Sequence, residues 1–219
     1  YTSSPAAVTI DLALGTGSGG DAEGDTLISI EGILGSAFDD DLTGNAADNL
    51  LGGAAGADAL DGAGGNDLAD YSLSPSAVTI DLAAGTASGG HAAGDTFTSI
   101  ESIRGSAFDD VLRGDASANE FDGGAGSDTL VGGGGIDTVD YRRSDAGVTV
   151  SLSTGTGSDG DAEGDSLATI ENLRGSGHDD NLTGDGNANV FQAGDGDDIL
   201  AGLAGADTLA GGEGIDTAD

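Results

Sequence analysis

Aspartate recurs in this chain every nine residues, usually five residues after a glycine. The unit is clearest at 53–58, Gly-Ala-Ala-Gly-Ala-Asp, and it returns at 123–128 and 132–137. In each unit glycine stands at or near positions 1 and 4, Asp at position 6, and usually an apolar residue at position 8. Glycine permits left-handed turns, and a carboxylate is an oxygen ligand for hard divalent cations. The spacing therefore predicts a series of turns that present carboxylates to metal ions.

The charge of the chain points to the same kind of partner. There are 40 acidic residues against 5 basic ones, a formal charge of −35, and aromatics make up only 4% of the residues. Such a chain resists collapse by self-repulsion, so something cationic has to offset the charge. Nucleic acids and anionic membranes are bound through Lys and Arg, so neither is expected here. A divalent metal is the natural partner.

Two further absences narrow the class of protein. No apolar run approaches the ~18 residues that a membrane span needs, so membrane insertion is not expected. Cysteine is absent, which excludes disulfides and thiolate metal sites. Metal ions would then take over the stabilising role that disulfides have in many small secreted domains.

A longer period encloses the nonapeptides. Three related blocks each open with tyrosine and span 1–70, 71–140 and 141–219, the third being longer by one nonapeptide. We expect the blocks to stack as one continuous elongated solenoid. Because the chain begins without Met and stops at Asp219, where the pattern elsewhere continues with Tyr, we interpret it as a piece of a longer array.

Each block has the same internal order. It starts with an apparent strand, such as Ala-Val-Thr-Ile-Asp-Leu at 7–12, whose alternation places Val8, Ile10 and Leu12 on one face. A Gly- and Asp-rich loop follows, and nonapeptides close the block. No stretch shows sustained 3.6-residue periodicity, so we predict essentially no helix.

The residues at position 8 are the predicted core. They are Leu42, Leu51, Leu60, Leu112, Phe121, Leu130, Val139, Leu182, Phe191, Leu200 and Leu209, with Ala69 and Ala218 as weaker members. Ordering costs about 1–2 kcal/mol per residue in backbone entropy, whereas burial of a medium side chain contributes about 1.5–3 kcal/mol. Such a thin core cannot hold the chain alone, so we expect metal binding and folding to be coupled.

The repeated unit matches the G-G-x-G-x-D-x-U-x pattern, where U is apolar. The chain therefore resembles the RTX, or hemolysin-type, calcium-binding repeat family, most specifically over 35–70, 105–140 and 175–219. The resemblance implies an all-β fold, a right-handed parallel β-roll or β-solenoid. It also implies several bound Ca²⁺, about seven or more.

In the family, each calcium ion sits between the turns of nonapeptides n and n+2, because two nonapeptides make one coil. Carried onto this sequence, the implied ligand pairs are Asp40–Asp58, Asn49–Asp67, Asp110–Asp128, Asn119–Asp137, Asp180–Asp198, Asn189–Asp207 and Asp198–Asp216. Backbone carbonyls of the glycine-rich turns would complete each shell.

Two nonapeptides of each block depart from the pattern. The first has Phe38, Phe108 or His178 where position 4 is elsewhere glycine, which leaves its turn geometry open. The second has Asn in place of Asp at position 6. Because Asn offers an oxygen without a charge, its sites are expected to be weaker.

The block openings contain further candidate ligands. Asp25, Asp95 and Asp165 stand before an x-apolar pair, as a true position 6 does. Glu31, Glu101 and Glu171 stand nine residues before the first position-6 Asp of their blocks. The alternative for both sets is a solvated carboxylate at a turn.

Enzyme sites are not supported. The stretches 15–20 and 155–160 match G-x-G-x-x-G, but acidic residues follow and would repel a pyrophosphate, which needs a helix N-terminus. Only His91 and His178 are present, without an H-E-x-x-H or G-x-S-x-G motif. We therefore expect no catalytic function in these residues.

By its resemblance, the chain would be a structural calcium-binding module of a secreted or cell-surface bacterial protein. It would pass a type I secretion channel unfolded and fold in the calcium outside the cell. One alternative is an adhesin or surface-layer segment that binds a glycan or neighbouring copies, although 3 Tyr and 5 Phe offer little for such a face. Another is the non-catalytic C-terminal part of a secreted hydrolase or toxin.

Overall fold

The computed structural model describes residues 1–219 and consists of short strands joined by turns. It contains no α-helix, only three single-turn 3-10 segments, η1 (Gly20–Ala22), η2 (Gly90–Ala92) and η3 (Gly160–Ala162). None of these segments is long or apolar enough to cross a bilayer. The chain divides into two compact units, Tyr1–Ser106 and Ala107–Asp219, which are described in turn.

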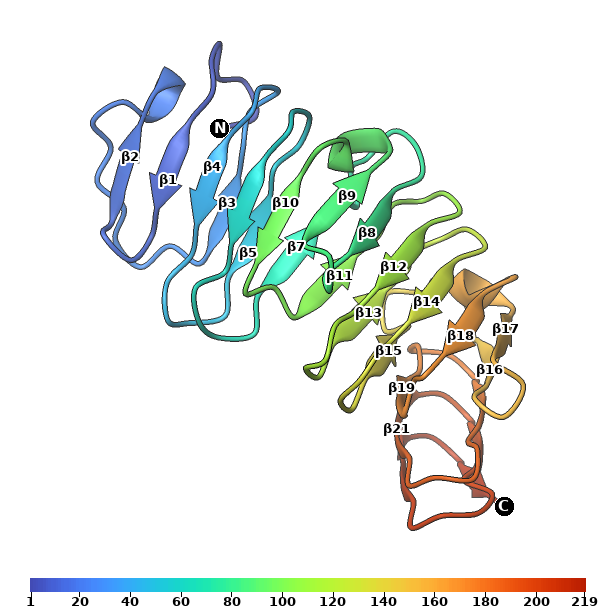
Figure 1. Ribbon diagram of the computed structural model, residues 1–219. Coiled ribbons are helices and arrows are strands. Elements are labelled where there is room, and N and C mark those ends of the chain that lie inside the picture. The colour runs from blue at the N-terminus through green and yellow to red at the C-terminus, as the bar shows by residue number, and fades with distance from the viewer. The chain divides into compact units, whose positions relative to one another are not determined.

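Unit 1 has two sheets that face each other across a narrow core (Figure 1). On the first face the strand order is β2-β1-β4-β6-β10-β9-β8, and on the second it is β11-β7-β5-β3. The strands are β1 (Thr9–Asp11), β2 (Thr16–Ser18), β3 (Gly32–Leu34), β4 (Asp41–Thr43), β5 (Leu50–Gly52), β6 (Ala59–Asp61), β7 (Leu68–Asp70), β8 (Thr79–Asp81), β9 (Thr86–Ser88), β10 (Thr96–Thr98) and β11 (Ser102–Arg104).

Unit 2 repeats this arrangement. Its first face runs β12-β14-β18-β17-β16-β20-β22-β24, and its second face runs β23-β21-β19-β15-β13. The strands are β12 (Val111–Arg113), β13 (Glu120–Asp122), β14 (Thr129–Val131), β15 (Thr138–Asp140), β16 (Thr149–Ser151), β17 (Thr156–Ser158), β18 (Ser166–Ala168), β19 (Asn172–Arg174), β20 (Asn181–Thr183), β21 (Val190–Asp195), β22 (Ile199–Ala201), β23 (Thr208–Glu213) and β24 (Thr217–Ala218).

The parallel pairing shows why the sequence repeats every nine residues. Strand β4 pairs with β6 so that Asp41 lies opposite Ala59, two nonapeptides further along. The strand between them, β5, lies in the opposite sheet and pairs with β7. One coil is therefore two nonapeptides, with one turn at each side of the roll. The predicted all-β roll without α-helix is confirmed.

The core of each unit is a stack of position-8 side chains. Ile10, Leu42, Leu60 and Phe97 are in register on the first face of unit 1, and all are at most 9% exposed. The other predicted core residues are buried too, except that Leu209 is half-buried and Ala218 exposed, because the last coil is covered on one side only. Each apolar residue thus covers the one in the coil before it.

The sheets are not wholly parallel, and this departs from the prediction. Strands β2, β9 and β17 form where the sequence predicts a Gly-rich loop, and each folds back antiparallel on the strand before it. A 3-10 turn follows each hairpin. In unit 1, β9 is antiparallel to both of its neighbours, β8 and β10. Three-residue strands with glycine or alanine at the centre carry too little apolar alternation to be seen in the sequence.

Candidate metal centre

The position-6 side chains form a ladder along each side of the roll. The backbone N–H of Asp40 donates to Oδ1 of Asp58 at 2.8 Å, and that of Asn49 donates to Oδ1 of Asp67 at 2.7 Å. The same bond joins Asp110 to Asp128, Asn119 to Asp137, Asp180 to Asp198, Asn189 to Asp207 and Asp198 to Asp216. The structure thus places all seven predicted ligand pairs on neighbouring coils. Their role as ligands stays a prediction.

The acidic residues of the block openings extend these ladders. Oδ1 of Asp95 accepts the N–H of Asp58, and Oε2 of Glu101 accepts that of Asp67. Asp165 and Glu171 do the same for Asp128 and Asp137. Asp25 and Glu31, in the first block, lie exposed.

Seven turns share one backbone conformation, and we call them the open turns. They are 53–58, 62–67, 123–128, 132–137, 193–198, 202–207 and 211–216. In every one of them φ is positive both at position 2 and at the glycine of position 4, for example 69° at Ala54 and 144° at Gly56. Glycine at position 4 is required because L side chains rarely adopt such angles.

The open turns leave carboxylate oxygens without a protein partner. The Oδ2 atoms of Asp58, Asp67, Asp128 and Asp198 are buried and accept no hydrogen bond. These four side chains are at most 1% exposed. Burial of a carboxylate oxygen without a hydrogen-bond donor is unfavourable in free energy. These atoms are therefore candidate ligands for a cation.

Glycine at position 1 keeps the space beside the carboxylate clear. A Cβ at Gly53 would collide with the carboxylate of Asp58, and a Cβ at Gly62 would meet both Asp67 and the carbonyl oxygen of Ser99. Gly132 stands in the same relation to Asp137 and to the carbonyl oxygen of Thr169. Carboxylate and carbonyl oxygens converge at Gly62 and Gly132, which is the ligand set that calcium prefers.

The remaining six turns have a different conformation, and we call them the closed turns. They are 35–40, 44–49, 105–110, 114–119, 175–180 and 184–189, and none of their residues has positive φ. Position 2 is Ser, Asn or Asp, and its side chain accepts the N–H of position 4, as from His178 to Ser176 Oγ at 3.1 Å. The equivalent bond runs from Ala47 to Asn45 Oδ1 at 2.8 Å. This side-chain turn removes the need for glycine at position 4, which explains Phe38, Phe108 and His178 there.

In a closed turn the position-6 side chain is bound by its own turn. Oδ2 of Asp180 accepts the Ser176 N–H at 2.7 Å, while Oδ1 accepts the Ser176 hydroxyl at 2.9 Å and the Val148 N–H at 2.7 Å. Oδ1 of Asn189 accepts the Asp185 N–H at 3.0 Å, and its amide donates to the carbonyl oxygen of Glu171 at 2.8 Å. Asn is therefore suited to this position, because the site offers one donor for its side-chain oxygen and one acceptor for its amide.

Burial of the ladders shifts the pKa values of the carboxyl groups. Desolvation, reinforced by the neighbouring Asp95 and Asp40, raises the pKa of Asp58 to about 7. Desolvation likewise raises the pKa of Asp128 to about 8 and that of Asp67 to about 6. Without a cation, Asp58 and Asp128 of the folded chain therefore hold protons near neutral pH.

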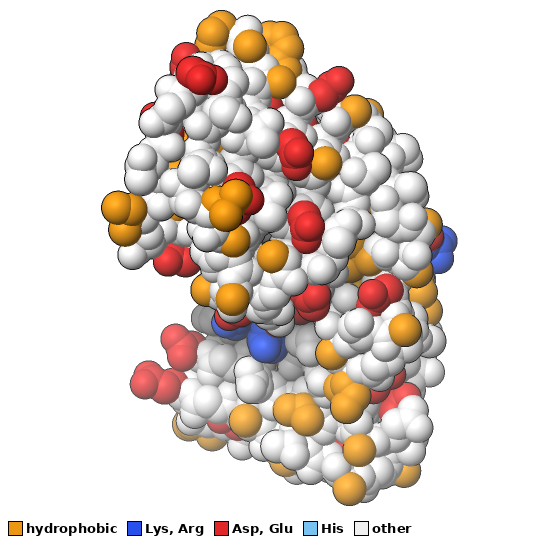
Figure 2. All heavy atoms as spheres, turned by 60° about the vertical axis from the view of Figure 1, so that its left-hand side comes forward, with side chains coloured by type: hydrophobic (Ala, Val, Ile, Leu, Met, Phe, Trp, Pro, Cys, Tyr) orange, Lys and Arg blue, Asp and Glu red, His pale blue; other side chains and the backbone are white.

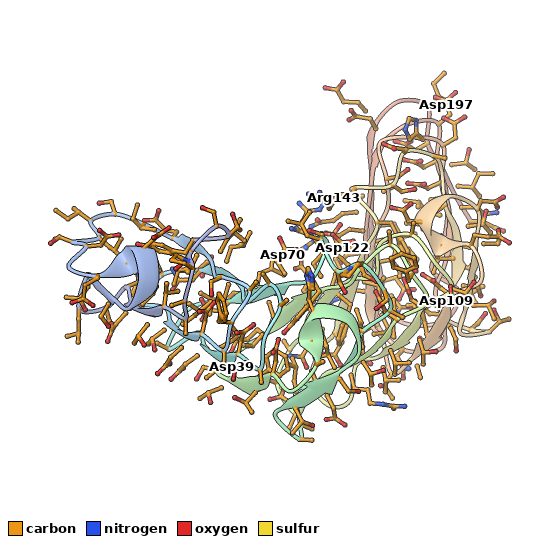
Figure 3. All side chains as sticks on the ribbon, turned by 90° about the horizontal axis from the view of Figure 1, so that it is seen from above. Asp39, Asp70, Asp109, Asp122, Arg143 and Asp197 are labelled. Carbon is orange, nitrogen blue, oxygen red and sulfur yellow. The ribbon has the colours of Figure 1, made fainter.

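Two sets of structural residues are not apparent in the sequence. Position-5 aspartates form a second, outer ladder, since Asp39, Asp109 and Asp197 project from the turns (Figure 3) and accept backbone N–H groups of the following coil at 2.9 Å each. In addition, the hydroxyl of Tyr71 donates to Oδ2 of Asp95 at 2.6 Å, and that of Tyr141 to Oδ2 of Asp165 at 2.8 Å. The tyrosine that opens each block is evident in the sequence. Its partner, 24 residues further on, could not be identified because the intervening hairpin was not predicted.

The side chains alone do not make a metal centre of the usual kind. No group of three or more His, Cys, Asp or Glu side chains is placed to hold a metal ion. Any ion must therefore take backbone carbonyls in addition to the carboxylates, and the glycine-lined turns provide them. Figure 2 shows Asp and Glu spread over the visible face, with basic side chains at only a few points.

The family model for the RTX calcium-binding nonapeptide repeat, which spans four copies of the repeat, matches this chain three times. The matches cover residues 34–69, 104–139 and 183–218, and each includes both open and closed turns. No curated protein matches the chain.

Proposed function

Because the chain carries RTX calcium-binding nonapeptide repeats, we propose that it is a structural module whose folding is driven by Ca²⁺ outside the cell. The observation that carries the proposal is the set of buried, unpartnered Oδ2 atoms of Asp58, Asp67, Asp128 and Asp198. Calcium supplies positive charge and accepts 6–8 oxygens, carboxylate and carbonyl alike. The open turns that begin at Gly62 and Gly132 place both beside position 1.

The position-6 aspartates of the open turns are the proposed ligands. They are Asp58, Asp67, Asp128, Asp137, Asp198, Asp207 and Asp216. One ion for each open turn would give about seven ions, which offset 14 of the 35 net negative charges. Since ion binding has to balance both repulsion and a thin core, we expect little folded chain without calcium at neutral pH.

A bacterial cell-surface or extracellular location follows from the same energetics. RTX repeats are typical of secreted bacterial proteins, and cytosolic calcium is too low to saturate weak sites. A chain that stays unfolded inside the cell can be exported, for example by type I secretion, and fold afterwards.

A calcium titration tests the proposal. Far-UV circular dichroism is recorded from a chelated start at neutral pH, with magnesium as the control. A cooperative gain of β signal at millimolar or lower calcium, absent with magnesium, is expected, because Mg²⁺ demands a stricter octahedral shell and dehydrates reluctantly. A spectrum already folded in chelator and unchanged by calcium would refute the proposal.

A second candidate function is glycan binding on the outer face of unit 2. A cavity of about 190 Å³ there is lined by Thr138, Asn172, Arg174, Val190 and Gln192. Hydroxyl, amide and guanidinium groups suit sugar hydroxyls. Binding of oligosaccharides to the calcium-loaded chain, lost in Asn172→Ala and Gln192→Ala variants, would support this role, and the absence of binding to a broad glycan panel would dismiss it.

A further inference from the structure

We infer that the closed turns do not ligate calcium, so that the chain alternates between calcium-dependent and calcium-independent coils. The inference rests on the proposed function and decides which carboxylates carry it. It separates two groups of residues that share the same spacing and the same position 6.

The first argument is the occupancy of the side-chain oxygens. Both carboxylate oxygens of Asp180 already accept hydrogen bonds from the protein, three in total. Asp40 has the same partners, namely the Val8 N–H, the Ser36 N–H and the Ser36 hydroxyl. Asp198, one coil further on, accepts one backbone N–H at Oδ1, whereas its Oδ2 has no partner. Calcium would have to displace donors in the closed turn but only fill a space in the open one.

The second argument is the choice of residue at position 6. All seven open turns have Asp there, whereas three of the six closed turns have Asn, at 49, 119 and 189. The Asn189 amide donates to the Glu171 carbonyl oxygen, and the Asn49 amide to that of Glu31 at 3.4 Å. A closed turn thus needs an acceptor oxygen for the position-2 N–H, while an open turn needs the negative charge.

The third argument is the conformation of the turn. Among the nonapeptide turns, positive φ at positions 2 and 4 occurs in the open turns alone. In the closed turns, the position-2 side chain instead holds the turn by accepting the position-4 N–H. The closed turn is therefore complete without an ion. It shares with the open turn the spacing, the ladder and the close approach of position-1 glycine to the position-6 oxygen, as at Gly175 and Asp180, but not the backbone angles or the unpartnered Oδ2.

The same reasoning applies where one block meets the next. Oδ1 of Asp95 accepts the Asp58 N–H and Oδ2 accepts the Tyr71 hydroxyl, and Asp165 has the equivalent partners Asp128 and Tyr141. Burial and the nearby Asp95 raise the pKa of Tyr71, so its hydroxyl keeps the proton that it donates. At Asp95 and Asp165 a tyrosine hydroxyl thus binds Oδ2, the atom that has no protein partner in Asp58, Asp67, Asp128 and Asp198.

The test compares two aspartates on neighbouring coils of unit 2, with the number of bound calcium ions measured at saturation by native mass spectrometry. Asp198→Asn is expected to lose at least one ion. Asp180→Asn is expected to keep the wild-type number, even if its fold is weakened, because the count at saturation does not depend on a modest loss of affinity. Loss of an ion from Asp180→Asn, as from Asp198→Asn, would overturn the inference.

A second variant keeps the test decisive if Asp198→Asn fails to fold. Asn189→Asp adds a negative charge to a closed turn, and isothermal titration calorimetry measures its calcium affinity. If Asn189 were a ligand, the added charge would tighten binding; under the inference, binding is unchanged or weaker, because the new oxygen faces the Glu171 carbonyl. Tighter binding by Asn189→Asp would therefore also overturn it.

Failure of the proposed function gives a different result. If the wild-type chain binds no calcium, the proposed function is refuted before any variant is compared. If the wild-type chain binds calcium and the two Asp→Asn variants behave alike, only the distinction between the turns is refuted.

Discussion

Residues 175–189 and 193–216 lie side by side in the third block and show how one spacing supports two kinds of turn. The first region has two closed turns and the second has three open ones. Both place Asp or Asn at position 6 on the same ladder, and Asp180 even donates its N–H to Asp198. They differ in the hydrogen bonds to the position-6 oxygens. In the first region Oδ2 of Asp180 accepts a backbone N–H, whereas in the second region Oδ2 of Asp198 has no protein partner.

The conformation of each turn correlates with the residue at position 2. Where it is Ser, Asn or Asp, its side chain binds the position-4 N–H and the backbone stays in the common region. Where it is Gly, Ala or Leu, no side-chain acceptor is present and φ is positive, as at Gly194 and Leu203. At Asp58, Asp67, Asp128 and Asp198 the position-6 carboxylate then has an Oδ2 atom without a protein donor. The predictions below test this difference, from the largest expected effect to the smallest.

The largest effect is expected from pH in the absence of calcium. The pKa values of Asp58 and Asp128 are raised by desolvation to about 7 and about 8 in the folded chain, against an ordinary value of about 4 when unfolded. Between these values the folded state binds more protons, so stability is full below about pH 4 and is lost as the pH rises through 7 to 8. In chelator, circular dichroism should show β structure gained on acidification from about pH 8 to about pH 5.

Calcium should reverse this dependence. Because the ligands must be deprotonated to bind the ion, the calcium-loaded chain becomes less stable as the pH falls. Asp128→Asn, which cannot titrate, should flatten the metal-free profile. A metal-free stability that rises with pH would contradict the assignment of protons to Asp58 and Asp128.

Next in size is a glycine substitution compared between the two regions. Gly196, in an open turn, has φ 133°, and a Cβ there would lie 2.6 Å from the carbonyl oxygen of His178. Gly196→Ala should cost about 3 kcal/mol or more, from backbone strain and overpacking of about 1–3 kcal/mol each. Urea unfolding in saturating calcium measures the loss.

The matched control is Gly186, in a closed turn. A Cβ there meets nothing within 4 Å, and its φ is not positive. Gly186→Ala should be neutral or stabilise the fold by about 0.4–1 kcal/mol. Equal losses in the two variants would mean that the turns do not differ as described.

A smaller effect is expected at the junction between blocks. Tyr141→Phe removes the hydroxyl that donates to buried Asp165, which should cost about 1.5–3 kcal/mol for a hydrogen bond to a charged group. Under the inference that this contact takes the place of an ion, the loss should be the same at limiting and at saturating calcium. Tyr1→Phe, whose partner Asp25 is exposed, is the control and should change stability by less than about 0.5 kcal/mol. A loss that vanishes in excess calcium would show that an ion can take the place of the hydroxyl.

The smallest effect is expected from the closed turn itself. Ser176→Ala removes a hydroxyl that donates to Asp180 and accepts from His178, at a cost of about 1 kcal/mol. The calcium affinity of the folded chain should not change. Thermal unfolding and calorimetry on the same preparation separate the two quantities, and a lost ion would argue against a metal-free turn.

Much of the fold could be predicted from the sequence because the repeat fixes it at every coil. Leu42 and Leu60 recur eighteen residues apart and lie opposite each other as parallel partners. The same spacing places Asp40 beside Asp58. The block-opening residues Asp95 and Glu101 also lie in phase with the ladders, as their positions indicated.

The rest could not be predicted for two physical reasons. The hairpin strand Thr16–Ser18 is held by backbone bonds to Thr9–Asp11, and its side chains have no apolar alternation to mark it. The closed turns depend on hydrogen bonds that the Ser36 or Asn45 side chain accepts from a backbone N–H two residues on, which the periodic pattern of Gly and Asp conceals. A closed turn and an open turn have the same spacing, so only the hydrogen bonds and the backbone angles distinguish them.

The hairpin that opens a block has a consequence for how such a chain can lengthen in evolution. In the third block, strand β16 begins a new parallel stack on β20, and the Val148 N–H satisfies Asp180 where a preceding carboxylate turn would otherwise be needed. The first nonapeptide of a block therefore needs no preceding carboxylate turn. The insertion or deletion of a whole block leaves every remaining open turn with equivalent neighbours, whereas the loss of a single nonapeptide would exchange the two sides of the roll.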